Sequence, residues 1–150
     1  MNIAEHVERA ARKTPKHTAS RLEGKTVTYE VLNVCASALA GALQKKGVRR
    51  GDRVALHLPN IPAFMLAYLA VEKAGGIAVS INALFKSEET RYILNDSGAK
   101  VLFTVAELLP NVARAECQSV RDVVLCEGTS PDAQSLDDWL EYGNAEFRTE

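Results

Sequence analysis

The chain has 150 residues, of which 47% are hydrophobic and 25% are charged. This length suits one domain with its own core, and the composition is near the globular average, which excludes disordered, collagen-like and coiled-coil proteins. The formal net charge of −1 creates no overall field that would attract nucleic acid or an anionic membrane. We therefore expect no nucleic acid among the partners.

The charge is unevenly distributed along the chain. Residues 1–50 contain ten Lys and Arg against four Asp and Glu, whereas residues 101–150 contain three against ten. Such asymmetry can mark a surface that binds a partner. The simpler interpretation, solvated helix faces followed by an acidic tail, is favoured.

The cysteines and the N-terminus bear on the compartment. Cys35, Cys117 and Cys126 are an odd number without Cys-x-x-Cys spacing, which disfavours a disulfide scaffold and a zinc site. Thiols suit a reducing compartment, so a cytoplasmic location is predicted. The first residues lack the apolar stretch of a signal peptide. The most apolar run, Ile61–Val71, is too short for a transmembrane segment and contains Pro62.

The first fifty residues predict a helix, a hairpin and a long amphipathic helix. Ile3–Arg12 has helical periodicity, and Glu23-Gly24-Lys25 is a turn between two short strands within Thr18–Thr28. Thr28 is expected to cap a helix over Tyr29–Lys46. The buried face of that helix is expected to contain four residues at three- and four-residue spacing, namely Leu32, Cys35, Leu39 and Leu43.

Strand and helix signals then alternate. Arg53–Leu58 predicts a buried strand. Asn60 is expected to cap a helix that is apolar nearly all round and ends at Gly75-Gly76. Ile77–Ile81 predicts a second strand, and Ser87 is expected to cap a helix over Ser87–Ser97.

The last third continues this alternation with weaker signals. Val101–Thr104 and Val123–Leu125 predict strands, separated by an irregular helix around Pro110–Gln118. Ser135–Tyr142 predicts a helical segment, and Asn144–Glu150 is polar without a closing strand. Strands joined by helices need right-handed crossovers and create a parallel sheet. We therefore predict an α/β fold, a doubly wound and largely parallel sheet with flanking helices.

No complete catalytic motif is present in the sequence. Gly24-Lys25-Thr26 resembles the end of a phosphate-binding P-loop, but Ala19 stands where that motif needs its first glycine. The Gly-x-Gly-x-x-Gly dinucleotide motif and the nucleophile elbow are also absent. We therefore assign no catalytic, no cofactor-binding and no metal-binding residue.

Histidines and paired acidic residues have simpler explanations than catalysis. His6, His17 and His57 show no ligand spacing, and His57 is expected to be a core histidine with satisfied hydrogen bonds. Neighbouring residues on a helix point about 100° apart, so Glu88-Glu89 and Asp137-Asp138 suit capping better than acid–base work.

A series of short motifs nevertheless follows a recognisable order. It consists of Val27-Thr28-Tyr29-Glu30-Val31-Leu32, Gly47-Val48-x-x-Gly51-Asp52-Arg53-Val54-Ala55, Leu58-Pro59-Asn60, Ala70–Gly76, Ser80-Ile81-Asn82 and Ser87–Lys100. The series resembles the start of the adenylate-forming (AMP-binding) superfamily of acyl-CoA synthetases, aryl-CoA ligases, luciferases and peptide-synthetase adenylation domains. Asn82–Glu89 is most similar to fatty-acyl and medium-chain acyl-CoA synthetases.

The resemblance implies an activity for a longer parent protein. Family members react a carboxylate with ATP to give an acyl-adenylate and pyrophosphate, then transfer the acyl group to coenzyme A, with magnesium neutralising phosphate charge. Their phosphate loop, nucleotide contacts and catalytic lysine lie further along the chain. Residues 1–150 are thus expected to be the N-terminal portion of the large domain. ATP, magnesium and coenzyme A would bind only the full-length parent, and the isolated chain would be inactive.

The expected partners are the remainder of the parent chain and a carboxylic acid such as a fatty acid. A fragment with a helix as apolar as Ile61–Val71 is expected to form a homo-oligomer or to be marginally stable. Two other functions stay open. One is a free-standing, non-catalytic α/β module that binds a partner through its charged halves, and the other is a small nucleotide-binding α/β protein.

Overall fold

A five-stranded parallel sheet forms the centre of the protein. The structure is a computed structural model that describes residues 3–143. The strand order is β4-β3-β5-β6-β7, and every neighbouring pair is parallel. The strands are β3 (Arg53–His57), β4 (Ile77–Ile81), β5 (Val101–Thr104), β6 (Asp122–Leu125) and β7 (Gln134–Ser135).

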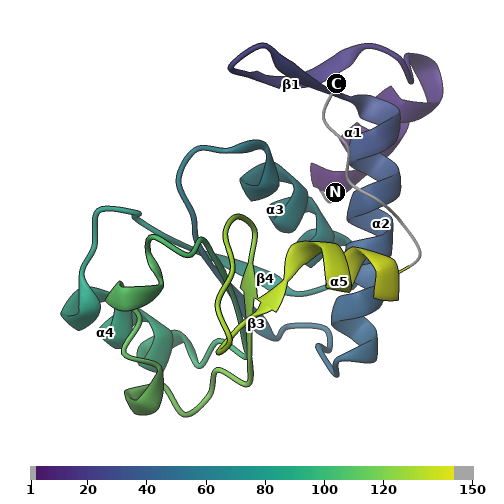
Figure 1. Cartoon of the computed structure of the whole chain (residues 1–150). Coiled ribbons are helices and arrows are strands. Elements are labelled where there is room, and N and C mark those ends of the chain that lie inside the picture. Colours follow the sequence, from purple (N-terminus) through teal and green to yellow (C-terminus); the bar gives the residue numbers. More distant parts are fainter. Residues whose placement is uncertain (1–2, 144–150) are drawn as a thin grey trace.

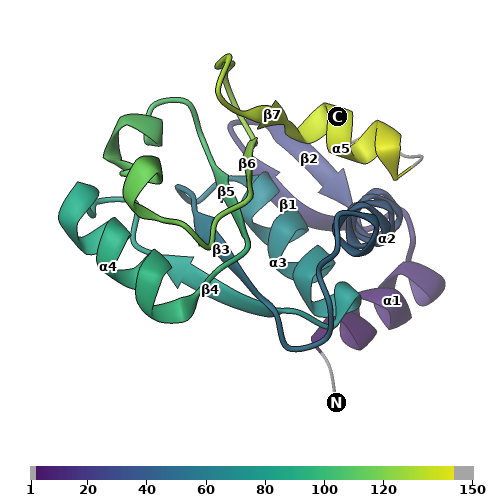
Figure 2. The ribbon, with the colours of Figure 1, turned by 90° about the horizontal axis from the view of Figure 1, so that it is seen from below.

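Helices cover both faces of this sheet. Figure 2 shows α4 (Ser87–Ser97) on one side and α2 (Tyr29–Lys45) and α3 (Pro62–Ala74) on the other. Successive residues of a strand point to opposite faces. Val54 and Leu56 accordingly pack in the core on the α2 and α3 side, whereas Ala55 packs in the core on the α4 side. The predicted doubly wound α/β fold is confirmed.

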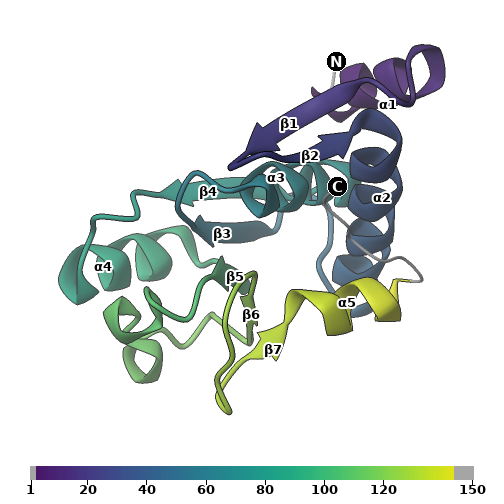
Figure 3. The same cartoon turned by 45° about the horizontal axis from the view of Figure 1, so that its top comes forward.

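The N-terminal elements pack outside the first helical layer. α1 (Ile3–Lys13) lies beside α2, and the antiparallel hairpin of β1 (Thr18–Leu22) and β2 (Lys25–Thr28) lies against α2 and α3 (Figure 3). At the other end of the chain, α5 (Leu136–Tyr142) packs across α2, as Figure 1 shows. The polar segment predicted for residues 144–150 lies outside the described residues.

The long helix α2 forms as its sequence predicts. The side-chain oxygen of Thr28 accepts a hydrogen bond from the Val31 backbone N–H at 3.3 Å, which satisfies one of the amides left free in the first turn. The four residues of the predicted apolar stripe are at most 1% exposed. The helix is therefore held by its cap and by one continuous buried face.

Two predicted caps are wrong by one residue. The helix α3 has Ile61, not Asn60, at its N-cap, because Pro62 occupies the first helical position, where its missing N–H costs nothing. The helix α4 begins at Ser87 with Lys86 as the N-cap, because the Glu89 carboxylate accepts a hydrogen bond from the Lys86 backbone N–H at 3.0 Å. Neither correction changes the order of the elements.

The segment between β5 and β7 also differs from the prediction. Instead of a helix around residues 110–118, it contains two 3₁₀ turns, η1 (Leu109–Asn111) and η2 (Arg114–Glu116). Three side chains of this segment, Val112, Cys117 and Val120, are buried in the core on the α4 side of the sheet. The two-residue strand β7 had no sequence signal, because such a short segment has no periodicity.

The loop after β6 packs closely against the chain at Gly128. The φ of Gly128 is +78°, and a Cβ here would lie 2.4 Å from the Ala106 Cβ; Gly24 has a similar φ of +82° with nothing within 4 Å. Both Gly→Ala changes strain the backbone, but Gly128→Ala adds a steric clash. We expect Gly128→Ala to cost about 1 kcal/mol or more beyond Gly24→Ala. Urea unfolding followed by the fluorescence of Trp139, the single tryptophan, measures both; equal losses would contradict the packing.

Candidate functional site

The two ends of the parallel sheet have different roles. From β3 the chain passes through α3 to β4 on one side, and from β4 through α4 to β5 on the other side of β3. The order therefore reverses between β3 and β5. In doubly wound sheets, ligands bind at the carboxyl ends of the strands at such a switch point. Several paired side chains of the described residues lie at the opposite, amino edge.

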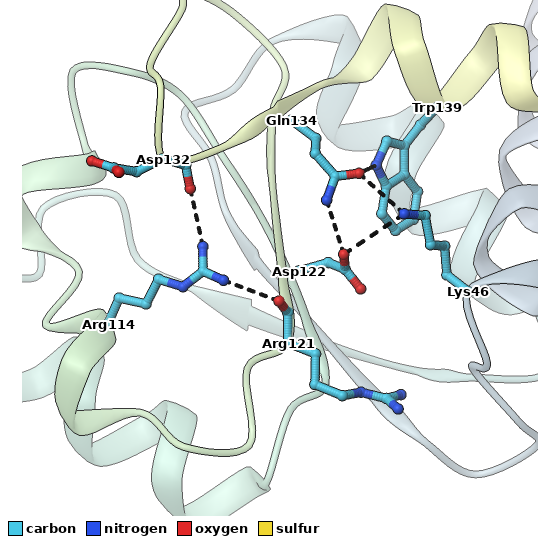
Figure 4. Close-up of polar contacts among 7 residues, drawn as sticks. All are labelled: Lys46, Arg114, Arg121, Asp122, Asp132, Gln134 and Trp139. Carbon is cyan, nitrogen blue, oxygen red and sulfur yellow. Dashed lines mark hydrogen bonds and ion pairs between the residues drawn. The ribbon is translucent and has the colours of Figure 1, made fainter.

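A polar network at the amino edge joins four residues, Lys46, Asp122, Gln134 and Trp139 (Figure 4). The Gln134 Oε1 accepts hydrogen bonds from the Trp139 indole Nε1 at 2.7 Å and from the Lys46 Nζ at 3.3 Å. The Gln134 amide Nε2 donates to the Asp122 Oδ1 at 2.9 Å. We call these four residues the amino-edge network.

Ring contacts reinforce the amino-edge network. The Lys46 Nζ lies 5.4 Å from the centroid of the Trp139 ring, and Trp139 meets Phe103 of β5 edge to face at 6.0 Å. Trp139 is 2% exposed. The network therefore fastens β7 and α5 to the end of α2 and the start of β6, which is a structural role.

Arg114 makes a second set of hydrogen bonds between segments nearby. Its guanidinium donates to the backbone carbonyls of Asp132 at 3.1 Å and of Arg121 at 3.0 Å (Figure 4). These contacts join η2 to the segments before β6 and before β7. Because both acceptors are backbone oxygens, the contact depends on the path of the chain and not on neighbouring side chains.

A third cluster surrounds Asp52, just before β3. Its carboxylate accepts hydrogen bonds from the Lys100 Nζ and from the Arg49 backbone N–H, both at 2.7 Å. The hydrogen bond from Lys100 and that from Arg49 hold the pKa of the Asp52 carboxyl below its usual value. Arg53 donates to the carbonyl of Ser97 at 2.6 Å. The charged groups of this cluster connect β3, α4 and β5 at the amino edge.

Two buried polar side chains lie at the carboxyl edge, at the switch point. His57 ends β3 and Thr104 ends β5, and both side chains are fully buried. Burial lowers the pKa of His57, and a hydrogen bond with the Asn82 backbone offsets part of that shift. The expected burial of this core histidine is confirmed.

The other predicted features lie apart from any converging set of side chains. Gly24-Lys25-Thr26 spans the tip of the β1–β2 hairpin, where a Cβ on Gly24 would have no atom within 4 Å. Glu89 bonds the backbone at the start of α4, and Asp138 forms a capping box with Ser135 at the start of α5. Within residues 3–143 there is no group of three or more His, Cys, Asp or Glu that could hold a metal ion.

The amino-edge network was not visible in the sequence. Lys46 and Gln134 are 88 positions apart, and no local spacing connects them. Only the helical segment predicted over Ser135–Tyr142 indicated an element in this region. The network depends on the sheet order, which brings β6 and β7 beside the end of α2.

With this geometry established, comparison with known proteins gives the family. Residues 7–148 match the family described as AMP-binding enzyme. The match spans nearly the whole chain, and the chain belongs to this family. The family indicated by the motif series is thereby confirmed.

Individual relatives agree with this assignment. The chain is 36% identical over 116 residues to a long-chain-fatty-acid–CoA ligase of Bacillus subtilis (strain 168), covering 77% of this chain and 21% of the relative. It is 36% identical over 107 residues to gramicidin S synthase 2 of Brevibacillus brevis, covering 71% of this chain and 2% of the relative.

A solved structure extends the likeness to the whole fold. The anthranilate CoA ligase AuaEII in complex with anthranoyl-AMP matches with a TM-score of 0.90 and 28% identity, over 99% of this chain and 30% of that chain. This chain therefore spans less than a third of the ligases described here. Among the described helices, none is both long and apolar enough to cross a membrane.

The amino-edge network predicts a stability effect. Gln134→Leu leaves the buried indole N–H of Trp139 without a partner, so we expect a loss of about 1–3 kcal/mol in the free energy of unfolding. The same change at the exposed Gln44 should cost less than about 0.5 kcal/mol. Urea titrations of both variants provide the comparison. Equal midpoints would show that the hydrogen bonds of Gln134 do not stabilise the fold.

The thiols are expected to be unreactive. None forms a disulfide. Burial raises the pKa of Cys35 to about 11 and that of Cys126 to about 12, and it also raises the pKa of Cys117. Since the thiolate is the nucleophile, labelling with a disulfide reagent at pH 8 should be roughly 100-fold slower for Cys35 and roughly 1,000-fold slower for Cys126 than for a free thiol, and Cys117 should also be slowed.

The denatured chain is the control for this measurement. In concentrated urea all three thiols should react at the ordinary rate. Rapid labelling of any one thiol in the native protein would contradict the burial described here.

Proposed function

We propose that residues 1–150 are the N-terminal portion of the AMP-binding large domain of a longer acid–thiol ligase. That ligase would activate a carboxylic acid with ATP and transfer the acyl group to coenzyme A. The observation that best supports this is the match over 99% of this chain with 30% of a CoA ligase at a TM-score of 0.90. The protein would act in the cytoplasm.

The described residues do not fit ATP, magnesium or coenzyme A. The only phosphate-loop-like segment found in the sequence is a hairpin tip. The Asp52 carboxylate is occupied by hydrogen bonds from Lys100 and Arg49. At the switch point, the side chains of His57 and Thr104 are fully buried. We therefore derive no step of the reaction from this part of the chain, and we propose that it is inactive alone.

A fatty acid is the proposed substrate class. The support is the similarity to a relative named long-chain-fatty-acid–CoA ligase and the likeness of Asn82–Glu89 to fatty-acyl synthetases. Gramicidin S synthase 2 is as similar to this chain as that ligase is, at 36% identity. Sequence similarity alone therefore does not select the acid, which must be identified by assay.

We propose that this chain associates with the remainder of the parent or with a second copy. The surface involved differs from the apolar helix on which the sequence-based expectation depends. The apolar helix α3 is covered within the chain, with Leu66, Ala67 and Val71 at 0% exposure. Large exposed apolar side chains lie instead on and after β4, where Ile77 is 50% and Leu84 is 80% exposed. Apolar surface of this kind is the part that a neighbouring segment or subunit would cover.

Acid-dependent exchange between ATP and pyrophosphate tests the proposal. The 150-residue chain should give no exchange above the blank with fatty acids of several lengths, while a polypeptide continued through the next encoded domain should give exchange. Intact Trp139 fluorescence provides the folding control for the short chain. Exchange by the short chain alone would overturn the proposed division of labour. A reading frame that stops after residue 150 would favour the free-standing interaction module instead.

A further inference from the structure

The two edge strands of the central sheet differ in length and chemistry. Figure 2 shows β4 and β7 at opposite margins of the sheet, and among the described residues each has a single neighbouring strand. β7 is two residues long, whereas β4 pairs with β3 over five residues in one continuous register. β4 contains no charged residue and no proline, which are features that prevent an edge strand from pairing with another chain. β4 is therefore open to a further strand.

The pairing with β3 determines which backbone groups of β4 point outward. The Ile77 N–H donates to the Asp52 carbonyl at 2.8 Å, and Ile77 pairs with Arg53. In a parallel pair, alternate residues of a strand bond the same neighbour. Ile77 and every second residue after it therefore bond β3, while Ala78 and Ser80 direct their N–H and C=O groups away from the sheet. The free edge offers the donor and the acceptor of both residues.

The side chains of β4 have the same order when the strand is read in either direction. Ile77, Val79 and Ile81 share one face of the strand, and Ala78 and Ser80 share the other. A second copy that runs antiparallel and is centred on the valine would place isoleucine against isoleucine and valine against valine. On the other face, alanine would lie against serine. No charge is brought against a like charge or into an apolar contact.

The same antiparallel arrangement also matches the backbone groups. When two β4 strands are centred on Val79, Ala78 of one copy lies opposite Ser80 of the other, and these are the residues whose N–H and C=O groups point outward. Two opposed residues of this kind exchange both hydrogen bonds, so the contact contains about four hydrogen bonds. Val79 then meets the same residue of the other copy in a non-hydrogen-bonded pair, with the Cα atoms about 4.5 Å apart.

We propose that β4 is the contact surface of a two-fold dimer, in which the β4 strands of two copies pair antiparallel and join the two sheets. A second copy is the occupant because the side-chain order and the outward backbone groups of β4 are both self-complementary. Each copy uses the same edge, so the assembly ends at two chains. The inference deepens the association proposed above and does not depend on the ligase activity, which the exchange assay tests separately.

Engineered disulfides test the register of the contact. Val79 would meet its own counterpart at a distance that a disulfide spans, so Val79→Cys should form a covalent dimer under mild oxidation with glutathione. Ser80→Cys is the matched control. Ser80 is more exposed than Val79, but it would lie opposite Ala78, so it should crosslink at least about tenfold more slowly. Equal or faster crosslinking of Ser80→Cys would overturn the proposal, because exposure alone would then explain the reaction.

Sedimentation equilibrium of the 150-residue chain measures the dimer itself, which should increase with concentration. Ile77→Lys places a charge in the apolar contact and should weaken the dimer about tenfold or more. Val34→Lys should leave it unchanged, because Val34 is similarly exposed, at 53% against 50% for Ile77, but lies on α2. Circular dichroism confirms that both variants fold.

Three results of the sedimentation experiment would overturn the proposal. They are a chain that stays monomeric at the highest attainable concentration, an assembly larger than two, and a dimer that Ile77→Lys weakens no more than Val34→Lys does. A monomer would leave the edge of β4 to an extended segment of the parent.

Discussion

Burial of the sheet on both faces is the constraint on which the rest of the structure depends. In β3, Val54 and Leu56 enter one core and Ala55 enters the other. A strand buried on both sides leaves no polar face, so water must be excluded by helices above and below. The alternation of helix and strand along the chain is the only simple connectivity that supplies both layers to a parallel sheet.

This constraint separates the two edges of the sheet chemically. At the amino edge, Asp52 and Asp122 stand at the beginnings of strands and are paired with Lys100 and Gln134. These polar groups stay near solvent while they fasten helices and loops to the strands. At the carboxyl edge, the polar side chains that end β3 and β5, His57 and Thr104, are buried. Among the described residues, these paired charges thus contribute to the assembly of the sheet and its helices.

The sequence predicted those features that depend on local spacing. The Thr28 cap, the hairpin around Gly24 and the parallel sheet follow from periodicity and from turn residues within a few positions of one another. The amino-edge network and the burial of His57 depend on which strands become neighbours. Sheet order involves long-range contacts that a single sequence does not express, so these features appear only in the folded chain.

The motifs that indicate the family are therefore those at which helices begin and end between the strands. Gly75 and Gly98 each adopt positive φ and end the two crossover helices, and Thr28 begins the long helix. Each sets the direction in which the chain re-enters the sheet, and an error at any of them would misplace a strand. These turns and caps build the scaffold on which the sheet is assembled. Chemistry that distinguishes one ligase from another must then depend on residues outside these turns and caps.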